Sequence, residues 1–165
     1  MRIIAGITLL AAPLLGACAH HVKTAQLEPG PAAITIERGP CFGACPVYSA
    51  TIRPDGEGSF AGRRFVAIAD ERQFKIAPET FQRIRHVLAS YRPAGTEERI
   101  GAEGCSAYAT DHPSWTIRWT EQGGETHTLH YDTGCHDDRY RGLAEAIRAT
   151  RALMPIDALV GRRDG

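Results

Sequence analysis

Cysteines and histidines are the residues of this 165-residue chain best able to do chemistry, five of the former and seven of the latter. Cys18 stands apart near the N-terminus. The other four are Cys41, Cys45, Cys105 and Cys135. An even number of cysteines is typical of disulfides in exported proteins. Because Gly43 allows a tight turn, the spacing favours a Cys41–Cys45 bond and leaves Cys105 to pair with Cys135; the two crossed pairings stay open.

A zinc centre is the alternative use of the same sulfurs. The C-x3-C spacing of Cys41 and Cys45 falls within the range of zinc ligands. Four histidines follow near the other two cysteines in the sequence: His112, His127, His130 and His136. Since an oxidising compartment converts thiols into disulfides, we expect two bridges, no metal and no other cofactor.

A polar recognition site is expected near the expected strand that contains His130. His130 and Asp132 share one face of that strand, which is the beginning of a general-base arrangement, whereas His127 points to the opposite face, towards the core. A hydrolase would also need a nucleophile, and neither Ser106 nor Ser114 stands in a G-x-S-x-G turn. The candidate recognition site comprises Asp111, His112, His130, Asp132 and His136.

The N-terminus resembles a bacterial lipoprotein signal. Met1-Arg2 is followed by an apolar run too short to cross a membrane, and the run ends in Leu14-Leu15-Gly16-Ala17-Cys18. We expect cleavage after residue 17, lipidation of Cys18 and a flexible tether over residues 18–32. Because Ala19 follows the cysteine, resemblance to Gram-negative lipoproteins implies the outer membrane, with the domain facing the periplasm.

The composition of the chain restricts the classes of partner that it is expected to bind. Nineteen Lys and Arg balance nineteen Asp and Glu, which argues against a nucleic-acid binder. The chain has no phosphate loop, no dinucleotide fingerprint and no H-E-x-x-H helix. We therefore expect a non-enzymatic module that is bound to a membrane through its lipid and contacts an envelope protein or a small ligand.

Alternating apolar residues predict an α+β domain over residues 33–160, in which an antiparallel sheet of about five to seven short strands packs with two helices. Residues 33–38 and 46–53 alternate, and the turn Pro54-Asp55-Gly56 places Ala50 opposite Phe60 in the following strand. Residues 64–69 and 72–76 read as a further hairpin. Residues 161–165 are expected to form a disordered tail.

A second hairpin joins the strands around Trp119 and His127. A three-residue loop, Gln122-Gly123-Gly124, keeps the apolar residues of both strands on one face and pairs Trp119 with His127. Helices are predicted from Pro78 to about Tyr91 and around the apolar stripe of Tyr140, Leu143 and Ile147. Asp137 or Asp138 is the expected cap of the second helix, and residues 96–104 are expected to be a loop.

The string Cys41-Phe42-Gly43-Ala44-Cys45-Pro46-Val47-Tyr48 resembles the opening C-[FY]-G-x-C-P-x-Y of the DUF6438 family, bacterial domains of unknown function that are often lipoproteins. Thr110-Asp111-His112-Pro113 resembles its later T-D-x-P element, and the resemblance covers residues 33–153. It implies no catalytic residues. Members often have the first cysteine pair alone, which implies that the Cys41–Cys45 bond is self-contained.

Overall fold

The computed structural model describes residues 30–161. The expected leader, most of the expected tether and residues 162–165 of the expected tail lie outside this range. No helix within residues 30–161 combines the length and the apolar character needed to span a bilayer.

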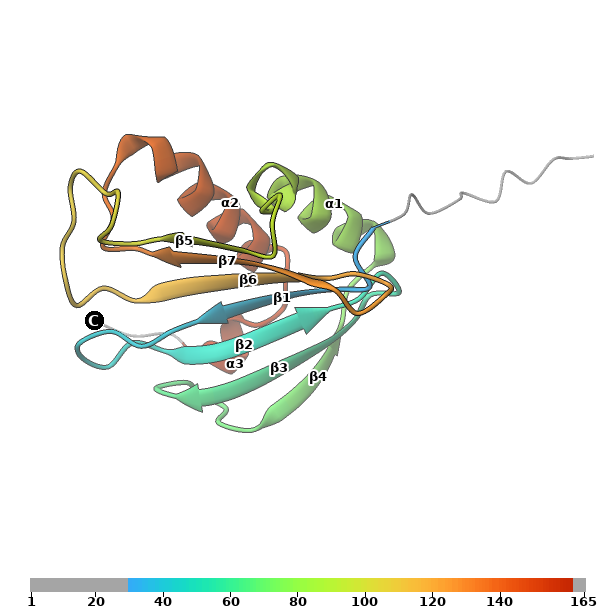
Figure 1. Cartoon of the computed structure of the whole chain (residues 1–165). Helices are drawn as coiled ribbons and strands as arrows, with labels where there is room; N and C mark the ends of the chain where they lie inside the picture. The colour runs from blue at the N-terminus through green and yellow to red at the C-terminus, as the bar shows by residue number, and fades with distance from the viewer. Residues whose placement is uncertain (1–29, 162–165) are drawn as a thin grey trace, which may run out of the picture.

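Seven strands form one sheet in the order β4-β3-β2-β1-β6-β7-β5 (Figure 1). The strands are β1 (Ala33–Arg38), β2 (Val47–Ile52), β3 (Glu57–Arg64), β4 (Glu71–Lys75), β5 (Glu97–Ile100), β6 (Ser114–Thr120) and β7 (Thr126–Asp132). Every pairing is antiparallel except the one between β5 and β7. The predicted α+β class, with a mostly antiparallel sheet, is therefore confirmed.

Both hairpin registers follow from keeping apolar side chains on one face. Ala50 pairs with Phe60 in the β2–β3 hairpin, as predicted. In the β6–β7 hairpin Trp119 pairs with His127, and the amide of Glu121 donates to the carbonyl of Glu125 at 2.8 Å across the turn. A slip of one residue in either hairpin would expose the aromatic side chains, which explains why the pattern sufficed to predict the register.

Helices cover one face of the sheet. They are α1 (Pro78–Leu88), α2 (Arg141–Ala152) and the short α3 (Asp157–Val160), with single 3-10 turns at η1 (Ala89–Tyr91) and η2 (Asp138–Tyr140). α1 and α2 lie side by side (Figure 1). Phe81, Ile84 and Leu88 of α1 are buried, as are Leu143 and Ile147 of α2. These apolar stripes and the inward faces of the strands form one core.

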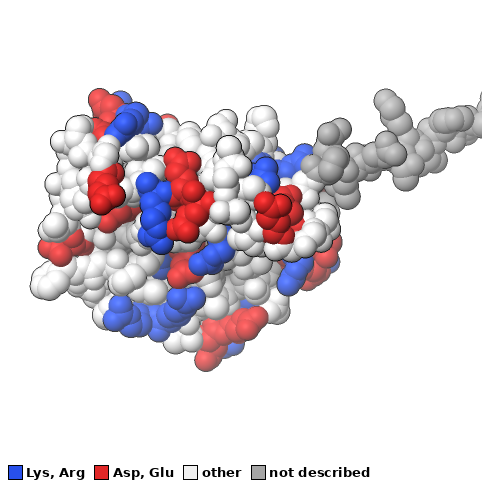
Figure 2. Space-filling view, in the orientation of Figure 1, with Lys and Arg blue, Asp and Glu red and all other residues white. Residues whose placement is uncertain are grey.

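The opposite face of the sheet is polar. Thr35 and Thr51 share a hydrogen bond of 2.9 Å there, and Glu37 accepts ion pairs from Arg63 at 3.0 Å and Arg118 at 3.5 Å. Figure 2 shows acidic and basic side chains interspersed, without a broad area of one sign. Such a surface is suited to water rather than to packing against another apolar layer.

Two predicted elements need correction. Residues 65–69 are not a strand: residue 64 ends β3, and β4 pairs with β3. The loop between the two strands bonds to the end of α3 through the amides of Ala67 and Ile68. Residues 96–104 are not all loop, because β5 pairs in parallel with β7. Only Ile100 of β5 is buried, so this charged edge strand carries no alternating apolar signal.

A substitution at Gly56 tests whether the turn between β2 and β3 sets the register of this hairpin. The φ of Gly56, 85°, is in the left-handed region, and an added Cβ would clash with the carbonyl oxygen of Ile76. We expect Gly56→Ala to lower the free energy of unfolding by about 1–3 kcal/mol. Gly123→Ala, where a Cβ meets open space, is the matched control and is expected to change it by less than about 0.5 kcal/mol. Equal effects in urea unfolding would contradict this assignment.

Candidate functional site

Three segments that are distant in the sequence meet where β1 ends and β6 begins. We call residues 39–46, 101–113 and 133–137 the braced end. The amide of Phe42 donates to the carbonyl of Asp111 at 3.1 Å. The amides of Ala109 and His136 donate to the carbonyls of Gly134 and Ala107, at 2.9 and 2.8 Å. The bond from Phe42 to Asp111 therefore joins the two motifs that carry the family resemblance, and the other two bonds hold residues 107–109 against residues 134–136.

Disulfides reinforce the same end. Cys41 pairs with Cys45, with Cα atoms 5.7 Å apart, and Cys105 pairs with Cys135, with Cα atoms 5.8 Å apart. This pairing agrees with the prediction, and the crossed alternatives are not formed. A carboxylate oxygen of Asp137 lies within 4.8 Å of the sulfurs of Cys105 and Cys135, but these two sulfurs form a disulfide bond with each other. The zinc alternative requires free thiolates, which this arrangement does not offer.

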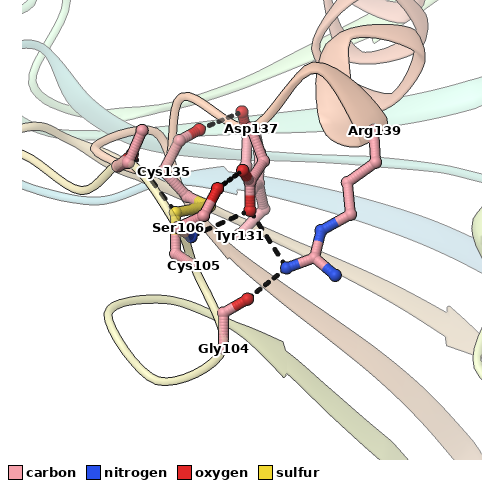
Figure 3. A network of polar contacts seen from close by, with 8 residues as sticks. Gly104, Cys105, Ser106, Tyr131, Cys135, Asp137 and Arg139 are labelled. Atoms are coloured by element: carbon pink, nitrogen blue, oxygen red, sulfur yellow. Dashed lines mark hydrogen bonds and ion pairs between the residues drawn. A yellow bond between two sulfur atoms is a disulfide. The ribbon is translucent and has the colours of Figure 1, made fainter.

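Asp137 is the centre of a polar network beside the Cys105–Cys135 bond (Figure 3). Its carboxylate accepts hydrogen bonds from the hydroxyl of Ser106 and, at 3.1 Å, from the backbone amide of the same residue. Arg139 donates to it at 3.0 Å and also to the carbonyl of Gly104. The bonds from Ser106 are the main reason why the pKa of Asp137 is lowered, and Arg139 adds to the effect.

This network corrects the expected helix cap. Asp137 stands at the N-cap position of η2, but neither η2 nor α2 has a side-chain cap hydrogen bond, and α2 begins only at Arg141. The carboxylate of Asp137 is turned instead towards Ser106, from the loop that the disulfide brings close. Asp137 thus bonds to Ser106, which is distant in the sequence, and not to a backbone amide at the start of the helix, as the sequence pattern suggested.

His130 and Asp132 lie on the polar face of β7, as expected, and line a pocket of about 280 Å³ with Arg99 and Glu103. Nδ1 of His130 lies 3.2 Å from the hydroxyl of Thr116. Burial, followed by the nearby charge of Arg99, lowers the pKa of His130. The environment therefore favours the neutral imidazole, whose Nδ1 is engaged with Thr116.

A Ser-His-Asp relay is not assembled here. Asp132 accepts its hydrogen bonds from the hydroxyl of Tyr108 at 2.7 Å and from the amide of Gly134 at 2.9 Å. Ser106 is engaged with Asp137 rather than with a histidine. Asp132 is thus used to fix the loop that contains Tyr108, which is a structural role.

Asp111, His112 and His136 belong to the braced end and not to the surface around His130. The rings of His112 and His136 meet edge to face, with centroids 5.2 Å apart, and both side chains are exposed. Asp111 has a φ of 71°, a conformation that aspartate tolerates better than most residues. The five predicted recognition residues therefore fall into two groups, which Asp132 joins through Tyr108.

A pocket that the sequence analysis missed lies directly beneath the braced end. It has a volume of about 280 Å³ between the sheet and α2. We call it the arginine pocket, and its lining residues are Arg38, Pro113, Trp115, Tyr131, Thr133, Ala144, Ile147, Arg148 and Arg151. The guanidinium carbons of Arg38 and Arg151 lie 5.7 and 6.0 Å from the centroid of Trp115.

The T-D-x-P element lines this pocket, and the cysteine motif packs against one of its lining residues. Pro113 of the T-D-x-P element lines it, and its carbonyl accepts a 2.6 Å hydrogen bond from the hydroxyl of Thr133, another lining residue. Tyr48 of the cysteine motif packs edge to face on Trp115, with ring centroids 6.2 Å apart. Tyr48 pairs with Arg38, and Arg38 with Trp115, in one row across the sheet.

One sequence signal could have found the pocket. Arg38 follows Ile34 and Ile36 at alternate positions, so the strand pattern already placed a cation on the buried face. Arg148 and Arg151 flank the apolar stripe of α2 at Ile147. Only the pairing of β1 with β6 and the packing of α2 on the sheet bring these arginines together, and neither follows from residue spacing.

The Cys105–Cys135 bond is expected to contribute most to the stability of the braced end. It closes a 30-residue separation, against 4 residues for Cys41–Cys45. We expect the double variant Cys105→Ser/Cys135→Ser to lose about 3–4 kcal/mol and Cys41→Ser/Cys45→Ser to lose about 2 kcal/mol, because longer loops gain more entropy when freed. Guanidinium unfolding of both variants measures the difference, and the reverse order would contradict the assignment.

Asp137→Asn is expected to destabilise the fold in a pH-dependent way. Because the pKa of Asp137 is lowered in the folded state, its stabilisation is complete above the ordinary aspartate pKa and is lost as the pH falls through the folded value. The difference from wild type should be constant between about pH 6 and 8 and should shrink as the pH falls below the ordinary aspartate pKa. Asp138→Asn, at a side chain that is 87% exposed, is the control. A difference that persists unchanged at low pH in urea unfolding would refute the role.

Comparison with known proteins identifies the domain but not its activity. The family model "Domain of unknown function (DUF6438)" matches residues 32–151, which is most of the chain. No curated protein matches the sequence. The matched region contains both cysteine pairs, the braced end and the whole sheet. The chain is therefore a member of the DUF6438 family.

Proposed function

We propose that this protein is a lipid-anchored, non-enzymatic binding module of the bacterial cell envelope. The signal-like N-terminus ending at Cys18 supports the anchor. The two disulfides support an oxidising compartment such as the periplasm. The choice of the outer membrane rests on Ala19 at the position after the lipidated cysteine.

The observation that carries the binding role is the placement of the braced end. The chain enters β1 at Ala33, which pairs with Thr120, and leaves it at Arg38, which pairs with Trp115 beside the arginine pocket. The six residues of β1 span roughly 20 Å. The start of β1 and the braced end are therefore at opposite ends of the sheet (Figure 1). We infer that the braced end faces away from the membrane.

Rigidity fits this role. A binding surface built from loops costs less entropy on binding when the loops are already fixed. Here two disulfides, a short backbone ladder and the Asp137 network fix segments that contain no long helix or strand. Phe42 is 87% exposed at the tip of the Cys41–Cys45 loop, a position where an aromatic side chain is available to a partner.

Cys18→Ser tests the anchor. In a Gram-negative host we expect the wild-type chain to take up labelled palmitate and to stay with the membrane after an alkaline wash, because two or more acyl chains hold a protein stably. The Cys18→Ser variant should take up no label and leave the membrane. The double variant Cys41→Ser/Cys45→Ser, which keeps Cys18, is the control and should still be labelled. Equal labelling of wild type and Cys18→Ser would overturn the proposal.

A further inference from the structure

We infer that the arginine pocket binds a small oxyanion, a carboxylate or a phosphoryl group, through the guanidinium groups of Arg148 and Arg151 with Arg38 opposite them. Three features of the molecule support this inference: the charge of the pocket, a buried donor without a partner and the size of the pocket. It does not depend on the lipid anchor, because it concerns only residues within the folded domain.

Charge is the first argument. Three of the nine lining residues are arginines, and none is acidic. Arg151 has an ion pair of 3.1 Å with Asp157, but that carboxylate is 79% exposed and is screened by water. Like charges that converge in a partly desolvated pocket repel one another, and an oxyanion between them replaces repulsion by attraction. Arginine also presents paired N–H groups that match two oxygens of one carboxylate or phosphoryl group.

An unsatisfied polar group is the second argument. Nε of Arg151 is buried and makes no hydrogen bond with any residue of the described range. The hydroxyl of Tyr48, next to Trp115, is also buried, and its polar neighbour is the side chain of Arg151. Burial raises the pKa of Tyr48, although the charges of Arg151 and Arg38 and a side-chain hydrogen bond with Arg151 oppose the shift. A buried donor is normally paired, so the unpaired Nε of Arg151 points to a missing acceptor.

Size and walls are the third argument. The pocket has a volume of about 280 Å³, close to the lower limit of ordinary ligand sites. Trp115, Tyr131, Ile147 and Pro113 supply apolar and aromatic walls. The site therefore has room for an anion with a short hydrocarbon or single-ring part, and not for a polymer.

Isothermal titration calorimetry on the full chain in detergent, at constant ionic strength, tests the inference with three probes. Inorganic phosphate represents the phosphoryl group, benzoate represents a carboxylate with a ring, and benzamide is the uncharged analogue of benzoate. We expect phosphate or benzoate to bind and benzamide not to bind. Binding of phosphate alone assigns the site to phosphoryl groups, and binding of benzoate alone assigns it to carboxylates.

Variants locate the binding. Arg151→Gln and Arg148→Gln should each weaken the bound anion roughly tenfold or more, because each removes charge-assisted hydrogen bonds. Arg141→Gln, which removes the same charge from the same helix outside the pocket, should bind as wild type does. Because Arg148 is exposed, Arg148→Gln is expected to fold, and it tests the role of the arginines if Arg151→Gln fails to fold. Absence of binding by both anions, equal binding of benzamide, or unchanged binding in both pocket variants would overturn the inference.

Discussion

The covalent bond between Cys105 and Cys135 is the constraint on which the braced end depends. Residues 101–113 contain no strand or helix, and a segment of this kind gains little stability from its own backbone. The disulfide holds it against the connection from β7 to α2, where Ser106 reaches Asp137 and residues 107–109 form a short ladder. Pro113, the residue before β6, is thereby held in place, and so is the part of the arginine pocket that it lines.

The arginine pocket illustrates how a domain of this size can place charge beside its core. Arg38 stands on the buried face of the central strand, at the end of an otherwise apolar row. Its guanidinium and that of Arg151 both lie against the ring of Trp115, an arrangement that offsets part of the cost of removing cations from water. Because α2 supplies two further positions for cations, the pocket exists only when the helix is docked on the sheet.

Much of the fold could be predicted from the sequence, because the pairing of Trp119 with His127 and of Ala50 with Phe60 follows from side-chain alternation alone. What could not be predicted depends on contacts between distant segments. The edge strand β5 lacks an apolar pattern. The side chain of Asp137 accepts hydrogen bonds from Ser106 instead of capping a helix. The predicted recognition residues lie in and beside the braced end, whereas Arg151 was not predicted because a surface-like helix position gave no sign of Trp115 beneath it.

Disulfide mapping of the chain isolated from the envelope, with free thiols alkylated before denaturation and without reduction, tests the central claim most directly. The account predicts one peptide linking Cys105 to Cys135, a separate link between Cys41 and Cys45, and no alkylated sulfur among these four. A peptide joining either member of the first pair to either member of the second, or alkylated Cys105 and Cys135 in the native protein, would contradict it.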